Sequence, residues 1–355
     1  MVIGIPKEKK TEEYRVGGLP ETVTLLREKG HTVLVETHAG IGAGIEDSDY
    51  IRAGAEICTT AKQLYERSQI IVKVKEPLPE EYPFLKSEHI LFTFFHFSAN
   101  IKMTETLVSK NVHCFAYELV EDKGIFPILA PMSEIAGRLA PQQGAKYLEK
   151  VYGGKGVLLS GGSSSRKGKV VIMGGGVVGM NAGLISYGMG AEVVIIELSS
   201  TRIKYLEKHF GKKYRIVQSC RENIEREIKD ADVVVGAVMV AGTRAPRLLS
   251  REYLKMIEPG SVLVDVAIDQ GGCFETSRPT NHLQPIFIEQ GIIHYCVTNM
   301  PGIVPRTSTY ALVAATTPYI VMLADKGIAA TKENTPLSKG YAVGNGKIIS
   351  DRIVL

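Results

Sequence analysis

Short apolar runs alternate with longer amphipathic stretches along most of the chain. In the first third the apolar runs fall at residues 2–5, 32–35, 70–75, 90–94 and 113–116. Helix-like patterns lie between them, such as residues 20–29, where Val23, Leu25 and Leu26 form an apolar side. Because the runs are apolar on both faces, we expect parallel strands that are covered by helices on both sides.

A second series of apolar runs follows one long helical pattern at residues 132–151 and a Gly/Ser/Lys-rich loop at residues 153–168. The strands predicted beyond this loop are residues 169–173, 192–197, 215–217, 232–237, 262–266 and 292–296. A last apolar-rich pattern at residues 307–326 predicts a helix that returns to pack on the first series.

This order predicts an α/β protein with two Rossmann-like, doubly wound domains and largely parallel sheets. The first domain is discontinuous and comprises residues 1–130 plus 305–355. The second, residues 131–304, is inserted into it. The length of 355 residues agrees with two domains of roughly 100–200 residues each.

Composition narrows the class of protein. With 45% hydrophobic and 23% charged residues, the chain is expected to be globular and not disordered. The net charge of +4 is spread thinly, without long basic runs, so we expect no nucleic-acid partner. No uninterrupted apolar run approaches the ~20 residues of a membrane-spanning helix. The first residues, MVIGIPKEKK, also lack the apolar core of a signal peptide.

The five cysteines are odd in number, far apart and never in C-x-x-C spacing. They are Cys58, Cys114, Cys220, Cys273 and Cys296. A disulfide framework and a metal site are therefore not expected, and the cysteine usage fits the reducing cytoplasm.

A glycine-rich motif predicts a dinucleotide site. Residues 174–179 read GGGVVG and match G-x-G-x-x-G between the predicted strand 169–173 and a helical pattern. Gly174 would permit the tight turn, Gly176 the close approach of a pyrophosphate, and Gly179 close packing of helix on strand. The helix N-terminus would offer free N–H groups to the phosphates. The alternative is a glycine-rich turn that binds no ligand.

The residue at the end of the next strand bears on which dinucleotide binds. Glu197 lies 23 positions after Gly174, where a carboxylate can accept both ribose hydroxyls of NAD and repel the 2′-phosphate of NADP. Arg202, five residues later, could accommodate that phosphate. The carboxylate favours NAD, and NADP stays open.

Three polar residues near strand ends are candidates for substrate chemistry. Arg15 follows the first strand, Lys75 closes the predicted strand 70–75, and His96 follows the apolar run 90–95. In open α/β sheets the ligand crevice lies outside the carboxyl ends of the strands, so Lys75 and His96 could face one cleft. The alternatives are a solvated loop arginine, a surface lysine and a core histidine.

Polar residues also follow strands of the second domain. In VDVAIDQGGCFE, Asp265 lies within the predicted strand and Asp269 lies beyond it, where a catalytic or cofactor-contacting acid is expected. Asn299 and Met300 close the last strand and would lie near a bound nicotinamide. The alternative for this second segment is a plain turn before Pro301.

Together these segments resemble the alanine dehydrogenase/transhydrogenase alpha-subunit family. The matching segments are RVGG, IVKVKEP, LFTFFHF, APMSEIAGRLA, GGGVVG, VDVAIDQGGCFE and NMPGIVPRTSTYAL, in order over residues 1 to about 340. The resemblance implies an NAD-dependent alanine dehydrogenase, which converts L-alanine reversibly to pyruvate and ammonium. It also implies a substrate domain at residues 1–130 plus 305–355, an NAD-binding domain at 131–304, and a cytoplasmic homohexamer.

The resemblance further implies residue roles. Arg15 and Lys75 would bind the carboxylate and carbonyl of the substrate, His96 would be the general acid/base, and Asp269 would assist proton transfer. The cofactor positions would be Ser133, Gly174, Gly176, Val177, Val178, Gly179, Glu197, Arg202, Ser219, Val238, Met239, Ile268, Asp269, Arg278, Asn299 and Met300.

Two other functions remain open on the sequence. One is an amino-acid dehydrogenase of the saccharopine type, whose substrate would need a roomier and more charged pocket than the phenylalanine-rich residues 92–97 indicate. The other is a non-catalytic NAD-binding subunit like that of a transhydrogenase. Glu197 departs from the aspartate that the family often has at this position, and the loop 160–168 departs from the family's usual sequence.

Overall fold

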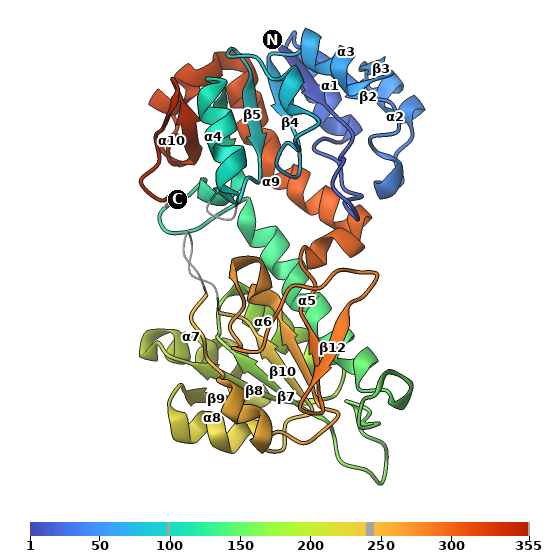
Figure 1. Cartoon of the computed structure of the whole chain (residues 1–355), viewed down its shortest axis with the longest axis vertical. Coiled ribbons are helices and arrows are strands. Elements are labelled where there is room, and N and C mark those ends of the chain that lie inside the picture. Colours follow the sequence, from blue (N-terminus) through green and yellow to red (C-terminus); the bar gives the residue numbers. More distant parts are fainter. Residues whose placement is uncertain (98–99, 239–244, 354–355) are drawn as a thin grey trace. The chain divides into compact units, whose positions relative to one another are not determined.

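The computed structural model describes residues 1–97, 100–238 and 245–353 (Figure 1). The chain divides into two compact units, each built on one mixed but largely parallel sheet. Unit 1 comprises Met1–Met132 and Gly302–Leu355, and unit 2 comprises Ser133–Pro301. The predicted fold class, two doubly wound α/β layers with one unit interrupting the other in sequence, is confirmed.

The sheet of unit 1 has eight strands in the order β15-β14-β6-β5-β4-β1-β2-β3. Its strands are β1 (Val2–Ile5), β2 (Thr32–Glu36), β3 (Glu56–Cys58), β4 (Ile70–Val72), β5 (Ile90–Thr93), β6 (His113–Ala116), β14 (Tyr341–Gly344) and β15 (Lys347–Ile348). The first six run parallel, and the C-terminal pair β14 and β15 joins antiparallel beside β6. Because β1 pairs with both β2 and β4, the strand order reverses between β1 and β4.

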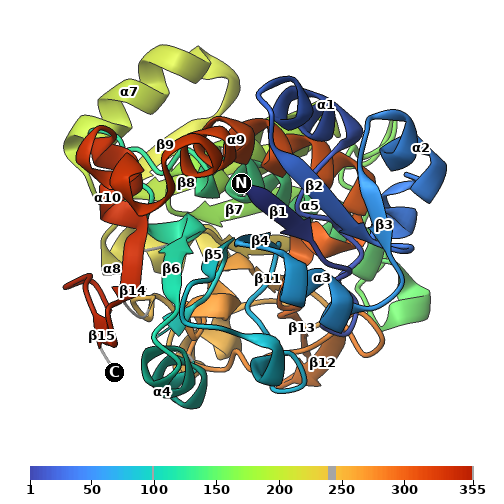
Figure 2. The ribbon, with the colours of Figure 1, turned by 90° about the horizontal axis from the view of Figure 1, so that it is seen from above.

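Helices cover both faces of this sheet (Figure 2). They are α1 (Pro20–Glu28), α2 (Asp47–Arg52), α3 (Ala61–Arg67), α4 (Ile101–Ser109), α9 (Pro305–Lys326) and α10 (Thr335–Gly340). On one face Tyr65 of α3 and Met103 of α4 pack on Leu34, Ile71 and Leu91. On the other face α9 contacts α1 and β4. This two-sided burial explains why the central strands, such as β4 and β5, are apolar on both faces.

Among the helices that the structure describes, the segment Pro305–Lys332 is long and apolar enough to cross a membrane by length and composition alone. Within unit 1, Leu312, Val313, Ile320 and Leu323 of this segment are buried. These four residues are thus accounted for by packing inside unit 1, while 39% of the apolar window as a whole is buried.

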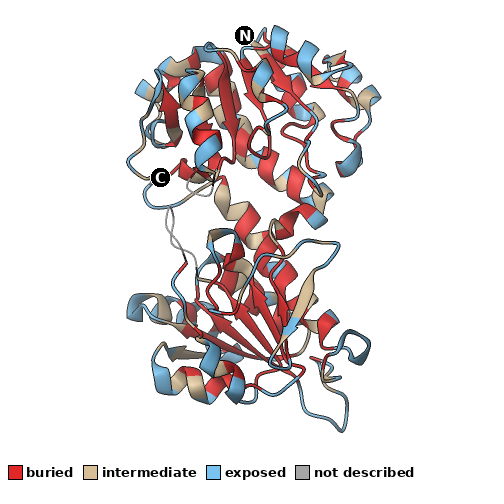
Figure 3. Ribbon diagram, viewed as in Figure 1, coloured by how far each residue is buried: buried red, intermediate tan, exposed pale blue. Residues whose placement is uncertain are grey.

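The sheet of unit 2 has seven strands in the order β12-β13-β11-β10-β7-β8-β9. Its strands are β7 (Lys169–Met173), β8 (Glu192–Glu197), β9 (Arg215–Gln218), β10 (Val233–Gly236), β11 (Val262–Asp265), β12 (Ile286–Glu289) and β13 (Ile292–Tyr295). All pair in parallel except β12, which runs antiparallel to β13. The order reverses between β7 and β10, and the residues of these two strands are all buried (Figure 3).

Four helices complete unit 2 or lead into it. They are α5 (Leu129–Tyr147), α6 (Val177–Gly188), α7 (Ser200–Phe210) and α8 (Arg221–Ile228). The predicted helix 132–151 begins and ends earlier than expected. Residues Lys150–Tyr152 instead form a separate 3₁₀ turn that Gly153, with φ +90°, ends. A positive φ stops a helix at little cost when the residue is glycine.

Two other expectations differ from the structure. The predicted strand 70–75 ends at Val72. Backbone hydrogen bonds with the β5 segment continue at Lys73 and Val74, but on the β1 side the N–H of Val74 is bound by the side chain of Glu8 and not by a strand. The strands β3, β12, β14 and β15 are not among the predicted ones. Three of them, β3, β12 and β15, are short edge strands with exposed residues such as Glu56 and Lys347, and β14 is a four-residue strand between β15 and β6.

Candidate active site

Arg15 lies in the loop after β1 and is buried, with 2% of its surface exposed. Its Nε donates to Glu13 Oε1 at 2.7 Å and its Nη2 to Glu13 Oε2 at 2.5 Å. Its Nη1 lies 3.1 Å from Met132 Sδ. The two hydrogen bonds that Arg15 donates to one carboxylate fix the plane of the guanidinium group. Arg15 is therefore not a solvated loop residue.

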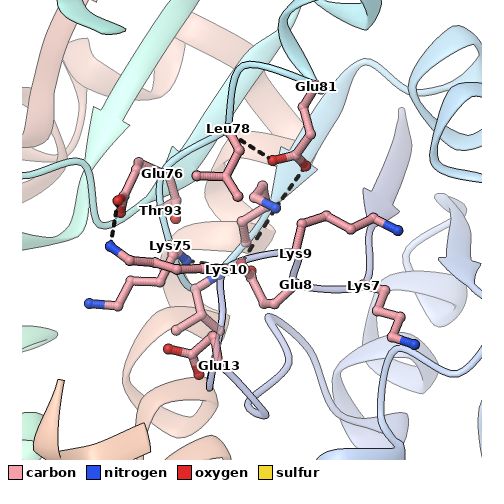
Figure 4. A network of polar contacts seen from close by, with 12 residues as sticks. Lys7, Glu8, Lys9, Lys10, Glu13, Lys75, Glu76, Leu78, Glu81 and Thr93 are labelled. Carbon is pink, nitrogen blue, oxygen red and sulfur yellow. Dashed lines mark hydrogen bonds and ion pairs between the residues drawn. The ribbon is translucent and has the colours of Figure 1, made fainter. Parts of the chain in front are cut away.

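Lys75 lies three residues beyond β4 and is also buried, with 6% exposed. The Oε1 atom of Glu8 accepts the Val74 N–H at 2.6 Å and the Lys75 N–H at 3.4 Å (Figure 4). The backbone that carries Lys75 is thus held by a side chain from the loop after β1. Its burial excludes a surface lysine.

Glu76 lies beside two of the candidate residues. Its Oε1 accepts from Lys10 Nζ at 2.6 Å. Burial alone would raise the pKa of Glu76, but Lys10, and then Lys75 and His96, lower it below its usual value. Both Lys75 and His96 therefore lie close enough to the Glu76 carboxylate to lower its pKa.

His96 has a strained backbone and a fixed ring. Its φ is +53°, in the left-handed region that residues other than glycine rarely adopt. Glu118, which follows β6, accepts the His96 N–H at 2.7 Å and the Phe95 N–H at 3.2 Å. The ring stacks on Phe94 with centroids 5.9 Å apart and stays partly exposed. A half-exposed imidazole on a strained turn is typical of functional sites and not of core histidines.

Arg15, Lys75 and His96 share one edge of the sheet. They follow β1, β4 and β5, which are neighbours in the sheet, so their carboxyl ends lie together. The strand order reverses between β1 and β4, and this is where ligands bind in open α/β sheets.

In unit 2 the glycine-rich motif forms the expected turn between β7 and α6. Gly174 has φ +102°, and Gly176 is the N-cap of α6 without a side-chain cap. Among the described residues, no neighbouring atom lies within 4 Å of where a Cβ on Gly176 would be. The N–H groups of the first turn of α6, which holds Val177 and Val178, therefore face an open approach that fits a pyrophosphate.

Gly179, the last glycine of the motif, allows α6 to pack closely against the turn. A Cβ on Gly179 would lie 1.9 Å from the carbonyl oxygen of Gly174, which is closer than any real contact. We expect Gly179→Ala to displace the turn, weaken NADH binding about tenfold or more, and lower the free energy of unfolding by about 1–3 kcal/mol. Fluorescence titration with NADH and thermal unfolding measure the two effects.

Gly188→Ala is the matched control for this prediction, because Gly188 lies in the same helix and no atom lies within 4 Å of its Cβ position. This variant should bind NADH as the parent protein does and be stabilised by about 0.5–1 kcal/mol. Equal NADH binding by both variants would contradict the role assigned to Gly179.

Glu197 ends β8 next to the glycine turn. Its Oε2 accepts the Gly175 N–H and its Oε1 the Ser199 N–H, both at 2.8 Å. Each oxygen keeps a further lone pair, so the carboxylate can still accept ribose hydroxyls. Arg202 Nε donates to the Gly175 carbonyl at 2.7 Å, and its guanidinium lies 4.6 Å from the Tyr205 ring centroid.

The other predicted cofactor residues of unit 2 surround this turn or lie farther along the same edge. Val238 follows β10 and packs on Gly174. A Cβ added to Gly174 would lie 2.6 Å from the Cγ2 atom of Val238. Ser219 follows β9 and donates its N–H to the Glu197 carbonyl at 2.8 Å. Ser133 is buried on α5, four residues before Gly137. Met239 lies outside the described residues.

Arg278 is one of the predicted cofactor positions, and Gly137, which is not, shows how α5 packs near them. A Cβ on Gly137 would lie 2.3 Å from the Val178 carbonyl, so α5 passes against the start of α6. Arg278 is exposed, and its guanidinium lies 4.2 Å from the Phe287 ring centroid.

Asp265, at the end of β11, is a structural residue. Its fully buried carboxylate accepts the N–H groups of Ala267, Cys273 and Phe274 at 2.9–3.2 Å and the Ser277 hydroxyl at 2.5 Å. Burial raises its pKa, against the effect of these donors. This one carboxylate thus holds the loop that follows β11 in its conformation, through hydrogen bonds to four of its residues.

That loop begins with the 3₁₀ helix η8 (Val266–Gln270), which contains Ile268 and Asp269. Asp269 is exposed, and its Oδ2 lies 3.5 Å from the N–H of Asn299, which follows β13 and has φ +60°. Met300, next in the chain, is buried. The structure therefore brings Asp269 and Asn299 together at the carboxyl edge of the unit 2 sheet.

The predicted residues fall into two groups. Arg15, Lys75 and His96 lie in unit 1, and Asp269 lies in unit 2 with the described cofactor positions. Sequence reasoning missed the carboxylates that hold the first group, Glu8, Glu13 and Glu118, and also Glu76, which binds Lys10 beside it. The signals available in the sequence were Glu13, two residues before Arg15, and Glu76, which directly follows Lys75.

Comparison with known proteins shows which family the chain resembles over its whole length. The family models described as alanine dehydrogenase/PNT, N-terminal domain and C-terminal domain, match residues 4–136 and 140–351. The chain is 46% identical to alanine dehydrogenase of Bacillus subtilis over 355 residues, 99% of this chain and 94% of that protein. A solved L-alanine dehydrogenase matches with a TM-score of 0.95 and 46% identity, over 99% of this chain and 97% of that chain.

A transhydrogenase from Sinorhizobium meliloti also matches, with a TM-score of 0.83, over 99% of each chain. Its identity of 22% shows a common fold alone. The family predicted from the sequence motifs is confirmed by the two family models and the near-complete similarity to alanine dehydrogenases. This chain belongs to the alanine dehydrogenase/PNT family.

Proposed function

We propose that this chain is an NAD-dependent L-alanine dehydrogenase. It converts L-alanine, NAD⁺ and water to pyruvate, NADH, ammonium and a proton, and catalyses the reverse reaction. The observation that carries the proposal is the 46% identity to an alanine dehydrogenase over 99% of the chain. The family implies a nicotinamide dinucleotide cofactor and small-molecule substrates.

Unit 1 supplies the groups proposed for the substrate, in residues 1–130 plus 305–355. Arg15 pairs with the carboxylate of alanine or pyruvate, and Lys75 binds the carbonyl oxygen of pyruvate. Two buried cations at the carboxyl edge of the sheet suit a small 2-oxo acid, because a carboxylate and a polarised carbonyl both carry negative charge.

His96 is proposed as the general acid/base. It takes the proton from the water that adds to the imine carbon and returns a proton when ammonia leaves the carbinolamine. An unperturbed imidazole titrates near neutral pH, which suits a group that gives and takes a proton in one cycle. Asp269, on the nucleotide-binding unit, is proposed to assist this transfer.

Unit 2, within residues 131–304, is proposed to bind NAD. The N–H groups at Gly176–Val178 would hold the pyrophosphate, Glu197 the adenosine ribose, and Asn299 with Met300 the nicotinamide end. When bound, the nicotinamide accepts the hydride from Cα of alanine. The chain itself contributes position, charge and a proton path.

Glu197 is expected to set the preference for NAD over NADP. Glu197→Ser removes the charge that repels a 2′-phosphate, while Arg202 remains nearby. We expect the ratio of kcat/KM for NAD to that for NADP to fall about 10- to 100-fold, as for loss of one charged contact. Steady-state rates with each cofactor measure it, and an unchanged ratio would contradict this role.

We also propose that the protein is a cytoplasmic homohexamer, an expectation carried over from the family. Light scattering with size-exclusion chromatography gives the mass in solution. A monomer or dimer at micromolar concentration would exclude the hexamer.

The test of the function is the absorbance of NADH with purified protein, NAD⁺ and L-alanine. NADH formation from alanine, and its consumption with pyruvate and ammonium, supports the proposal. Activity only with lysine and a 2-oxo acid would indicate the saccharopine type instead. NAD binding without turnover of alanine would indicate a non-catalytic subunit.

A further inference from the structure

A chain of buried charged groups lies beneath the carboxyl end of β4 in unit 1. The side chain of Lys73 is 1% exposed, and its Nζ lies 2.9 Å from Glu81 Oε1 and 3.4 Å from Glu8 Oε2. Glu81 also accepts the Tyr65 hydroxyl at 2.9 Å and the Leu78 N–H at 2.8 Å (Figure 4). The proposed chemistry uses none of these groups.

Glu8 connects this network to Lys75. Pairing between β1 and β4 ends at Ile71, so no strand holds the residues that follow β4 on that side. The Oε1 atom of Glu8 replaces the missing strand partner, because it accepts the N–H groups of Val74 and Lys75. The Oε2 atom of the same carboxylate makes no hydrogen bond within the described residues, and it faces the Lys73 ammonium group at 3.4 Å as an ion pair.

The network is costly to bury. Burial raises the pKa of Glu8 to about 7, against the effect of Lys73, while the Glu13 carboxylate and the Glu81 carboxylate raise it further. Burial lowers the pKa of Lys73, but Glu8 and Glu81 raise it overall. A buried ion pair is often no more stabilising than well-packed apolar side chains of similar volume. Stability alone is thus a weak reason for a carboxylate at this position.

We propose that Glu8 is a positioning residue, whose carboxylate fixes the backbone at Val74 and Lys75 so that the Lys75 ammonium group meets the substrate carbonyl. The proposal rests on the proposed function, since that function gives Lys75 its role. This positioning effect depends on where the acceptor oxygen of the Glu8 side chain lies and not on the charge of that side chain.

Two variants separate position from charge. Glu8→Gln keeps an oxygen at the same distance along the side chain and loses the charge, while Lys73 keeps Glu81. Glu8→Asp keeps the charge and withdraws the acceptor by one methylene. We expect kcat/KM for pyruvate, with NADH and ammonium, to fall about 100-fold in Glu8→Asp, because small misplacements of a binding group are costly.

Glu8→Gln should stay within about fivefold of the parent protein, since one neutral hydrogen bond contributes roughly 1 kcal/mol. Both variants should bind NADH as the parent does, because the cofactor residues lie in unit 2. Tyr65→Phe is the control: it removes a hydroxyl from the far end of the network, without touching the Lys75 backbone. It should change thermal stability and leave kcat/KM within about twofold.

Amide hydrogen exchange at Val74 tests the positioning independently of turnover. Protection should survive in Glu8→Gln and Tyr65→Phe and fall at least tenfold in Glu8→Asp. Equal or greater losses in Glu8→Gln than in Glu8→Asp, in exchange or in kcat/KM, would overturn the proposal. So would a Tyr65→Phe variant that loses kcat/KM as much as Glu8→Asp does. If the parent protein lacks alanine turnover but the exchange pattern holds, the proposed function fails and the backbone contact of Glu8 stands.

Discussion

His96→Ala should lose about 10²- to 10⁴-fold in kcat, which is the usual contribution of one general acid/base. The affinity for NADH should change by less than about twofold, because the residues proposed for the cofactor lie in unit 2 and His96 lies in unit 1. Single-turnover rates and NADH titration measure the two quantities. An equal loss of cofactor affinity would contradict the role assigned to His96.

His113→Ala provides the control for this prediction. His113 begins β6, at the opposite edge of the same sheet, where its Nδ1 lies 2.7 Å from the Tyr341 hydroxyl. Its removal costs a contact in unit 1 without reaching the carboxyl ends of the strands. A similar loss of kcat in His113→Ala would mean that His96→Ala acts through the stability of the unit and not through proton transfer.

Arg15→Ala should have two separable effects. The KM for pyruvate should rise about 10- to 100-fold, since a charge-assisted pair with a carboxylate contributes roughly 1.5–3 kcal/mol. The free energy of unfolding should fall by about 3–5 kcal/mol, because the Glu13 carboxylate, which is also buried, loses the guanidinium group. Steady-state kinetics and denaturant unfolding measure these effects.

The double variant Arg15→Ala with Glu13→Gln distinguishes binding from folding. Neutralising Glu13 removes the buried charge, so most of the lost stability should return. The high KM should remain, because no cation is restored for the substrate carboxylate. Recovery of KM together with stability would show that Arg15 only supports the fold.

The pairing of Arg15 with Glu13 also limits how the substrate can be bound. Two of the guanidinium nitrogens donate to Glu13, and the third, Nη1, lies beside Met132. A substrate carboxylate would therefore meet a guanidinium whose plane is already fixed. This reduces the conformational entropy lost on binding.

Much of this architecture is determined by local patterns in the sequence. The apolar runs predicted β1, β6, β7 and β8 with the bounds that the structure has. Such runs mark strands well, because the central residues of a strand covered on both faces are apolar. The motif at residues 174–179 predicted its turn, since only glycine fits φ +102° at Gly174 and the close approach at Gly179. The family motifs, which span almost the whole chain, predicted the family.

The tertiary structure alone decided how the candidate residues are held. Glu118 accepts the His96 N–H although the two residues are 22 positions apart in the sequence. Glu8 accepts the Val74 N–H from 66 positions away. Which loops become neighbours depends on the strand order around β1 and β4, and hydrophobic periodicity does not encode that order. The sequence therefore determined which residues can do the chemistry. The sheet order decided which carboxylates position them, because such contacts form only when distant strand ends are brought side by side.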